Sequence, residues 1–320
     1  MRRGEGVTLT IGVDVGGTKV LGGVVDPEGK LLAWTRRNTP AHDVSQTLEM
    51  IVDVVRELAA KHEVEAVGVG AAGWIDAERS NVLFAPNLAW RNEPLRDAVA
   101  SVVGLPVVVE NDANVAAWAE FQFGAARDAH TSLLLTIGTG IGGGIVLNGE
   151  LVRGAHGIAA EFGHMLAVPD GHPCGCGRRG CLEQYTSGSA LVREAQILAK
   201  NNPDSARILL ELAGGDPGRI DGPMVTQAAQ QGDNAALAAF IEIGTWLGIG
   251  MADLVQILDP QVIVVGGGVI DAGDLLLAPA RTAYTQSLAQ RARLAVAEIR
   301  PAELGPRAGV IGAADLARRR

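Results

Sequence analysis

Two similar glycine-rich segments constrain the fold of this chain most strongly. The first, IGVDVGGTKVLGGVVDPEGKLL, begins at Ile11, and the second, IGTGIGGGIVLNGELV, begins at Ile137, 126 positions later (137 − 11). Each reads as a strand, a glycine turn, a second strand and a further turn that contains glycine. Two copies are too few for a solenoid, so the pattern predicts a duplicated α/β unit with a ligand held between its two halves.

Strand-like and helical segments alternate along the rest of the chain. Residues 45–62 and 95–103 place apolar side chains at helical spacing. Short apolar runs at 65–70 and 106–111 read as buried strands, and the long apolar segment 235–259 reads as a helix that leads into another strand. This alternation is typical of α/β architecture.

Composition and charge exclude several classes of function. Hydrophobic residues make up 48% and charged residues 20% of the chain, the balance of an ordinary globular protein. The formal net charge is −9, and the basic clusters at Arg2–Arg3 and Arg318–Arg320 are interpreted as frayed ends. We therefore expect no nucleic acid partner. No run of about 18 uninterrupted apolar residues occurs, so we expect a cytoplasmic protein with no membrane partner.

The glycine loops contain partial matches to nucleotide-binding motifs. Residues 68–73 and 138–143 both fit G-x-G-x-x-G, but that fingerprint needs a helix after the glycines, and turn-like or strand-like residues follow here. Gly12 and Gly17 have the spacing of a P-loop, but Thr18 and Lys19 follow in the reverse of the required order. Neither a dinucleotide fold nor a P-loop is predicted.

The two hairpin turns are candidate phosphate sites. Each offers backbone N–H groups unblocked by side chains together with a threonine hydroxyl, an arrangement that binds phosphate oxygens, although the glycines could simply permit tight turns. Asp14, beside the first turn, could hold Mg²⁺ through water. A third glycine cluster, which ends an apolar strand, could accept a flat adenine or form only a turn. The candidate residues are Asp14, Gly16, Gly17, Thr18, Lys19, Thr139, Gly140, Gly266 and Gly267.

All three cysteines of the chain lie within eight residues. Cys174, Cys176 and Cys181 form a C-x-C-x4-C pattern in a glycine-rich stretch, which favours a structural Zn²⁺ site over free thiols. A tetrahedral site needs a fourth ligand, and the nearby candidates are His156, His164 and His172. Pro173 makes closure from His172 awkward, whereas His164 lies ten residues before the first cysteine and can fold back. We therefore predict His164 as the fourth ligand.

Two glutamates flank this cluster in the sequence. Glu161 lies three residues before His164, and Glu183 lies two residues after Cys181. Solvated surface is the ordinary fate of a glutamate. However, a metal that joins these segments would bring both carboxylates together, and carboxylates accept hydrogen bonds from sugar hydroxyls.

Asn111 and Asp112 lie where a buried strand passes into a helix. Asp112 could cap that helix, because aspartate is favoured at the first position of a helix for that reason alone. It could equally face the crevice at the carboxyl end of the strand and accept a hydroxyl proton during phosphoryl transfer. The position alone does not separate the two roles.

Five segments in this order carry a family resemblance: DVGGTK, ENDANVAAWAE, GTGIGGGIV, AEFGHM and CGCGRRGCLEQYTSG. The chain resembles the ROK family of sugar kinases and sugar-responsive repressors, and within it the bacterial ATP-dependent glucokinases, from Gly12 to the final helix. The resemblance implies an α/β fold of the actin-like, ribonuclease-H-like type, with a small domain (residues 1–112 and 305–320) and a large domain (113–304) that carries the zinc loop. Phe162 stands where the family has an aliphatic residue.

The resemblance also implies roles for individual residues. Asp112 is the expected base, and His164 is both a zinc ligand and a sugar contact. The other expected sugar contacts are Asn87, Asn111, Asp112, Glu161 and Glu183. The glycine loops become two phosphate loops and an adenosine loop. The implied reaction transfers phosphate from ATP with Mg²⁺ to the 6-hydroxyl of glucose, as in glycolysis, in a homodimer or homotetramer.

Other readings stay open at this point. The hexose could be fructose, mannose or N-acetylmannosamine, and polyphosphate could replace ATP. A sugar-sensing repressor would need a DNA-binding module, and only about seven residues precede the first predicted strand, so we expect an enzyme.

Overall fold

The computed structural model describes residues 8–289 and 295–320. Residues 1–7, with Arg2 and Arg3, lie outside this range. The chain divides into two compact units. The first unit comprises the described residues up to Leu134 together with Gly143–Ala160 and Ala302–Arg320, and the second comprises Leu135–Gly142 and Glu161–Pro301. The two-domain division expected from the sequence, with its boundary at residue 112, stays a prediction.

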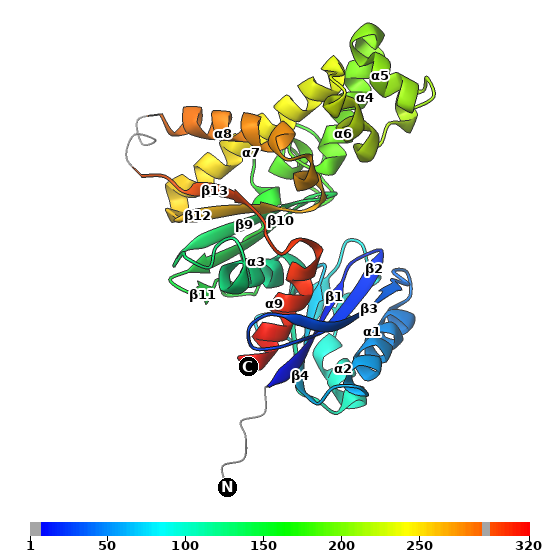
Figure 1. Ribbon diagram of the computed structural model, residues 1–320, viewed down its shortest axis with the longest axis vertical. Helices are drawn as coiled ribbons and strands as arrows, with labels where there is room; N and C mark the ends of the chain where they lie inside the picture. Colours follow the sequence, from blue (N-terminus) through cyan, green and yellow to red (C-terminus); the bar gives the residue numbers. More distant parts are fainter. Residues whose placement is uncertain (1–7, 290–294) are drawn as a thin grey trace. The chain divides into compact units, whose positions relative to one another are not determined.

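A five-stranded sheet forms the centre of the first unit (Figure 1). Its order is β3-β2-β1-β4-β8, in which β2 runs antiparallel to both β3 and β1, whereas β4 and β8 run parallel to β1. The predicted hairpin after Ile11 is thus confirmed as β1 and β2. The strands are β1 (Leu9–Val15), β2 (Lys19–Val25), β3 (Leu31–Asn38), β4 (Val64–Ala71) and β8 (Val107–Asn111).

Helices cover both faces of this sheet. Buried side chains of α1 and α2 join one apolar cluster with the strands, and those of α3 and α9 join a second cluster with Leu21 and Val25 of β2. A small sheet of three short strands completes the unit. The elements are α1 (Val44–Ala59), α2 (Leu95–Val103), α3 (Asp112–Phe123), α9 (Ala308–Arg318), β5 (Trp74–Ile75), β6 (Val82–Phe84) and β7 (Arg91–Glu93).

Glycines let α9 lie directly against the sheet. A Cβ atom at Gly12 would lie 1.9 Å from the carbonyl oxygen of Val310, and one at Gly68 would lie 1.8 Å from that of Ala313. No side chain fits at either position, so the first glycine of each motif-like stretch serves packing rather than ligand binding.

The second five-stranded sheet repeats the order of the first. Its order is β11-β10-β9-β12-β13, with β12 and β13 parallel. In both sheets the central strand, β1 or β9, pairs on one side with the next strand of its glycine hairpin. On the other side it pairs with a strand from later in the chain, and this shared order confirms the predicted duplication. The strands are β9 (Ser132–Ile137), β10 (Ile141–Leu147), β11 (Glu150–Leu151), β12 (Val262–Gly266) and β13 (Glu298–Pro301).

Among the residues that the structure describes, five α-helices belong to the second unit, and α7 is the longest of them. It is long and apolar enough to cross a membrane by length and composition alone, and among the described helices it alone passes that test. Its core-facing side chains are buried, and Gly248 allows α8 to approach so closely that a Cβ there would lie 2.2 Å from the Ala280 carbonyl oxygen. The helices are α4 (Gly188–Asn201), α5 (Arg207–Leu212), α6 (Gly222–Gln230), α7 (Asn234–Leu258) and α8 (Asp274–Leu288).

The arginines at the C-terminus are not frayed, contrary to the sequence-based expectation. Arg318 donates to Thr10 Oγ1 at 2.9 Å and to the Val25 carbonyl oxygen at 3.0 Å. Arg319 pairs with the buried Asp315 at 2.7 Å. The bonds of Arg318 tie the end of α9 to the first two strands. The pair with Arg319 compensates the buried charge of Asp315.

Candidate active site

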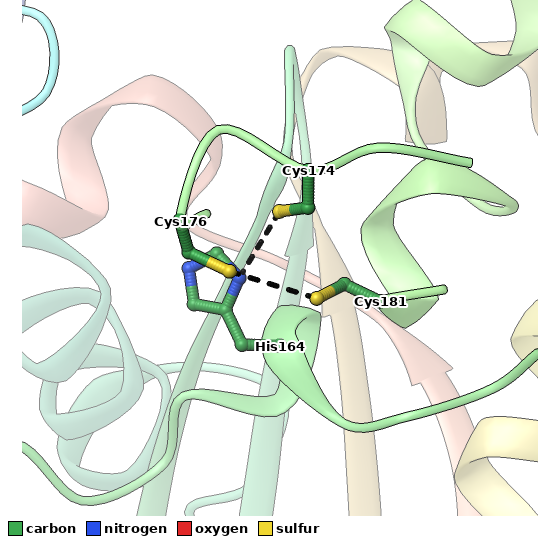
Figure 2. A group of neighbouring side chains, drawn as sticks. All are labelled: His164, Cys174, Cys176 and Cys181. Carbon is green, nitrogen blue, oxygen red and sulfur yellow. Dashed lines mark hydrogen bonds between the residues drawn. The ribbon is translucent and has the colours of Figure 1, made fainter. Parts of the chain in front are cut away.

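Four side chains converge on one point in the second unit (Figure 2). The sulfur atoms of Cys174, Cys176 and Cys181 and a ring nitrogen of His164 all lie within 4.8 Å of one another. His164 Nδ1 lies 3.6 Å from Cys174 Sγ. The structure therefore assembles the predicted set around His164, while the His172 ring packs against Tyr185 instead.

The backbone folds locally to bring the four ligand atoms together. His164 ends a single 3-10 turn, Phe162–His164, and Cys181 precedes a second one, Leu182–Gln184. The backbones of Cys181 and Leu166 form an isolated antiparallel β-bridge, and the Cys174 N–H donates to the Arg178 carbonyl oxygen at 2.8 Å. Gly180 has a φ of 77°, which closes the loop back onto the first segment.

Burial and neighbouring groups shift the pKa values of the thiols. Burial raises the pKa of the Cys174 thiol well above its usual range, and the nearby Glu183 carboxylate raises it further. For Cys176, burial alone would raise the pKa, but hydrogen bonds from the Arg178 backbone and the neighbouring thiols lower it. Three soft sulfurs and one imidazole fit tetrahedral Zn²⁺, with every position filled by protein.

Both predicted carboxylates lie beside His164. Glu161 Oε2 lies 3.7 Å from His164 Nε2, and Glu183 Oε1 lies 3.8 Å from His164 Nδ1. Cys174 Sγ donates to Glu183 Oε1 at 2.9 Å. The sequence-based expectation that the cysteine cluster gathers these two acids is therefore met in the geometry.

Glu183 also touches the second glycine loop. A Cβ atom on Gly140 would lie 2.5 Å from Glu183 Oε2, so the carboxylate occupies the space that a side chain would need. Gly163 is packed similarly, with the Ile141 carbonyl oxygen 2.7 Å from a Cβ at that position. The cysteine cluster, the acids and the loop at Thr139–Gly140 thus form one packed group.

A cavity of about 1000 Å³ adjoins this loop. Its size falls at the upper end of the range for small-molecule sites. Gly268 and Asp271 line it, whereas Gly266 ends β12 and Gly267 is not among the lining residues. Gly267 has a φ of 88° and no room for a Cβ, so it shapes the turn beside the cavity. Side chains from α4 and α6 that sequence reasoning missed also line it, among them Gln196, Thr226 and Gln230.

The first glycine loop lies in the first unit beside Asp14. Burial raises the pKa of Asp14 to about 6, and Lys19 opposes that shift. Gly16 and Gly17 form the turn, the Gly16 N–H donates to the Lys19 carbonyl oxygen at 3.0 Å, and the Thr18 side chain is exposed. A buried acid whose ionisation is disfavoured is stabilised by a bound cation, which fits the predicted Mg²⁺ role.

Asn87, the weakest of the predicted sugar contacts, lies against this loop. A Cβ on Gly17 would lie 3.0 Å from Asn87 Cβ, and the Asn87 side chain is exposed. The segment that carries Asn87 therefore packs on the first glycine loop.

The start of α3 separates the two roles considered for Asp112. Asn111 is the N-cap, and its Oδ1 accepts from the N–H groups of Ala113 and Asn114 at 2.9 and 3.0 Å. Its Nδ2 donates to the Gly73 carbonyl oxygen at 3.0 Å and to Asp112 Oδ1 at 3.1 Å. Asn111 is thus the N-cap, and Asp112 is the first residue of the helix, at the carboxyl end of β8, where its Oδ1 also accepts from the Ala113 N–H at 3.0 Å.

A buried acid beside Asp112 escaped the sequence analysis. Glu110 is 1% exposed and pairs with Arg79 and Arg153. The signal was present, because a charged residue directly after the buried run of β8 needs partners.

These features define a class before any relative is considered. Two sheets of the same order, each with a glycine hairpin, and a large cavity beside one hairpin are the attributes of a duplicated α/β nucleotide-binding fold of the actin-like type. Within that class, the Cys₃His cluster beside the hairpin is an additional distinguishing feature of this chain.

Comparison with known proteins identifies the family. The ROK family model matches residues 10–320, so the chain belongs to the ROK family. A glucokinase of Streptomyces coelicolor is 49% identical over 97% of this chain and 98% of its own length, and a glucokinase of Thermotoga maritima is 36% identical over 97% of each. A ROK glucokinase of Streptomyces griseus, solved with glucose and AMPPNP, superposes with a TM-score of 0.89 at 49% identity, over 98% of this chain and all of that one. The expected fold is thereby confirmed.

Proposed function

We propose that this protein is a glucokinase, which transfers the γ-phosphoryl group of ATP to the 6-hydroxyl of glucose. Relatives named glucokinase that match nearly the whole chain support this reaction. The structural observation that supports it most is the contact between Glu183, a predicted sugar contact, and Gly140, in a predicted phosphate loop.

The acceptor is bound by polar side chains in this proposal. Glu161, His164 and Glu183 would hydrogen-bond to sugar hydroxyls, as would the predicted contacts Asn87 and Asn111. Carboxylates that accept two hydroxyl hydrogens discriminate strongly against an analogue that lacks one of them. His164 keeps its position because its ring also belongs to the cysteine cluster.

Asp112 acts as the general base. As the 6-oxygen of glucose attacks the γ-phosphorus, the hydroxyl proton passes to the Asp112 carboxylate while the bond from phosphorus to the bridging oxygen of ADP breaks. The products are glucose 6-phosphate, ADP and, after Asp112 releases it, one proton. Backbone N–H groups at Gly17 and Gly140, with the Thr18 and Thr139 hydroxyls and Lys19, stabilise the charge on the transferred group.

Two metal ions complete the proposal. Asp14 would hold Mg²⁺ through water, where the ion supplies charge neutralisation on the phosphates. His164 and the three cysteines would hold Zn²⁺, and its role would be structural because protein fills all four positions. The cavity beside Gly268 and Asp271 would take the adenosine of ATP. The protein would act in the cytoplasm, in glycolysis, as a homodimer or homotetramer.

A coupled assay of ADP release over a panel of sugars tests the proposal. Glucose is expected to give the highest kcat/KM among glucose, mannose, fructose and N-acetylmannosamine. The same panel with polyphosphate in place of ATP, read as glucose 6-phosphate, tests the donor. Faster turnover of another hexose would reassign the substrate within the family. Sequence-specific DNA binding without phosphorylation of any sugar would instead make the chain a sugar-sensing repressor.

A further inference from the structure

The network around Glu110 is the one buried charge cluster in the described chain that the proposed reaction does not use and that adjoins its base. Glu110 lies on β8, immediately before Asn111 and Asp112, and its side chain is 1% exposed. Burying a carboxylate costs several kcal/mol unless charged partners and hydrogen bonds compensate. A valine at this position, like the three that precede it, could be buried without this cost in free energy. We therefore look for a role of the acid other than stability.

The two carboxylate oxygens of Glu110 face different partners. Oε2 lies 2.6 Å from Nε of Arg153 and 3.1 Å from Nε of Arg79. Oε1 accepts from the Asn111 N–H at 2.9 Å and from Nδ2 of Asn114 at 3.1 Å. One oxygen is therefore held by two guanidinium groups, and the other holds the first turn of α3.

Arg153 anchors this group to a different part of the first unit. Its two terminal nitrogens donate to the carbonyl oxygens of Asp76 and Ala77, each at 2.7 Å, and its side chain is only 12% exposed. Arg79, from the same turn as these carbonyls, supplies the second guanidinium. The planar guanidinium of Arg153 thus donates to two carbonyl oxygens and forms an ion pair with Glu110 through Nε, a set of contacts that a lysine cannot make.

Glu110 accepts hydrogen bonds from residues on both sides of Asp112, the proposed base. Asn111 precedes Asp112 and Asn114 follows it by two, so the peptide that leads into Asp112 and the side chain after it are both tied to one buried carboxylate. The direction in which the Asp112 side chain leaves α3 depends on the φ and ψ angles of this turn. Reaction geometry is sensitive at this scale, since a displacement of about 1 Å costs about 100-fold in rate.

We propose that Glu110, held by Arg153 and Arg79, is a positioning residue that sets the orientation of Asp112 for proton transfer. The inference rests on the proposed function, in which Asp112 is the base. It assigns Glu110 and Arg153 an effect on kcat that is transmitted through Asp112 alone.

Glu110→Gln is the first test, with Glu120→Gln as the matched control. The amide keeps the shape of Glu110 but loses the charge that holds both guanidinium groups. Glu120 is an equally buried acid on α3, the helix that follows Glu110, and it accepts from the N–H groups of Ala125, Glu303 and Leu304 at the far end of that helix. We expect Glu110→Gln to lower kcat about 100-fold with an unchanged KM for ATP. Glu120→Gln should lower stability while kcat stays near that of the wild type.

A double-variant comparison separates positioning from general damage. If Glu110 acts through Asp112, adding Glu110→Gln to Asp112→Asn lowers the residual kcat no further, because residues that act as one unit are not additive. An equal fold-loss in both backgrounds would overturn the proposal, and so would a Glu110→Gln enzyme with kcat near wild type.

Arg153→Lys covers the case in which Glu110→Gln does not fold. It keeps a positive charge beside Glu110 and loses the fork, so we expect a folded protein with a lower kcat; full activity would overturn the proposal. Crystal structures of the variants give a readout without activity: the first turn of α3 should move in Arg153→Lys and stay in place in Glu120→Gln. A wild type that phosphorylates no sugar would defeat the proposed function, whereas an unmoved turn in Arg153→Lys would defeat only the positioning role.

Discussion

Replacing Asp14 by asparagine should stabilise the metal-free protein while it abolishes catalysis. Burial raises the pKa of Asp14 from 3.8 to about 6, so the folded state favours the protonated carboxyl. Proton binding by this carboxyl therefore favours the folded state. That stabilisation is fully present below pH 3.8, the pKa of the unfolded state, and is lost as the pH rises through 6, the pKa of the folded state. A shift of about two pKa units corresponds to about 3 kcal/mol at pH 7.5 and about 2 kcal/mol at pH 5. A neutral amide avoids this cost at every pH.

Urea unfolding at pH 5 and pH 7.5 measures the effect. The buffer contains no Mg²⁺ or nucleotide, and no chelator that would strip the cysteine cluster. We expect Asp14→Asn to raise the free energy of unfolding above that of the wild type, with the larger gain at pH 7.5. Asp53→Asn, on the exposed side of α1, is the control and should change neither value. The reasoning fails if Asp14→Asn is no more stable than the wild type at pH 7.5, or if its gain does not depend on pH.

Three further outcomes follow from contacts in the structure. Gly140→Ala should raise the KM for glucose about tenfold by displacing Glu183, whereas Gly138→Ala, with open space at its Cβ, should not; equal effects in steady-state kinetics would refute the contact. Removing the metal from the cysteine cluster with a chelator should weaken glucose binding, measured by calorimetry, more than it weakens ATP binding. Restoring Zn²⁺ should release protons, because the raised pKa of Cys174 keeps its thiol protonated without the metal. An unchanged glucose affinity would show that the cluster does not support the sugar site. Gly68→Ala should lower the free energy of unfolding by about 1–3 kcal/mol or more through its clash with α9, and a urea midpoint equal to that of the wild type would contradict this.

The fold could be predicted from sequence wherever a local pattern determines the structure. The glycine hairpins at Ile11 and Ile137, their duplication and the helix at 235–259 all depend on periodicity and turn residues, which the sequence displays directly. The cysteine spacing likewise identified its own ligand set, because three thiols and the preceding histidine lie close together in the chain.

Features that depend on distant segments could not be predicted. Glu110 meets Arg153 across 43 positions (153 − 110), and no periodicity connects them. The polar wall of the cavity comes from α4 and α6, whose Gln196 and Thr226 read as ordinary helix surface in the sequence. Asn111 takes the capping role instead of Asp112, since cap geometry is decided by backbone angles that residue type alone leaves ambiguous.

Turnover by Asp112→Asn tests the central claim most directly, when it is measured together with glucose binding on the same protein. The amide keeps the size of the side chain and removes the proton acceptor. We predict that kcat for glucose phosphorylation falls by a factor of about 100 to 10,000 while calorimetry still detects glucose binding. A variant that binds glucose and turns over at nearly the rate of the wild type would contradict the role of Asp112 as the base.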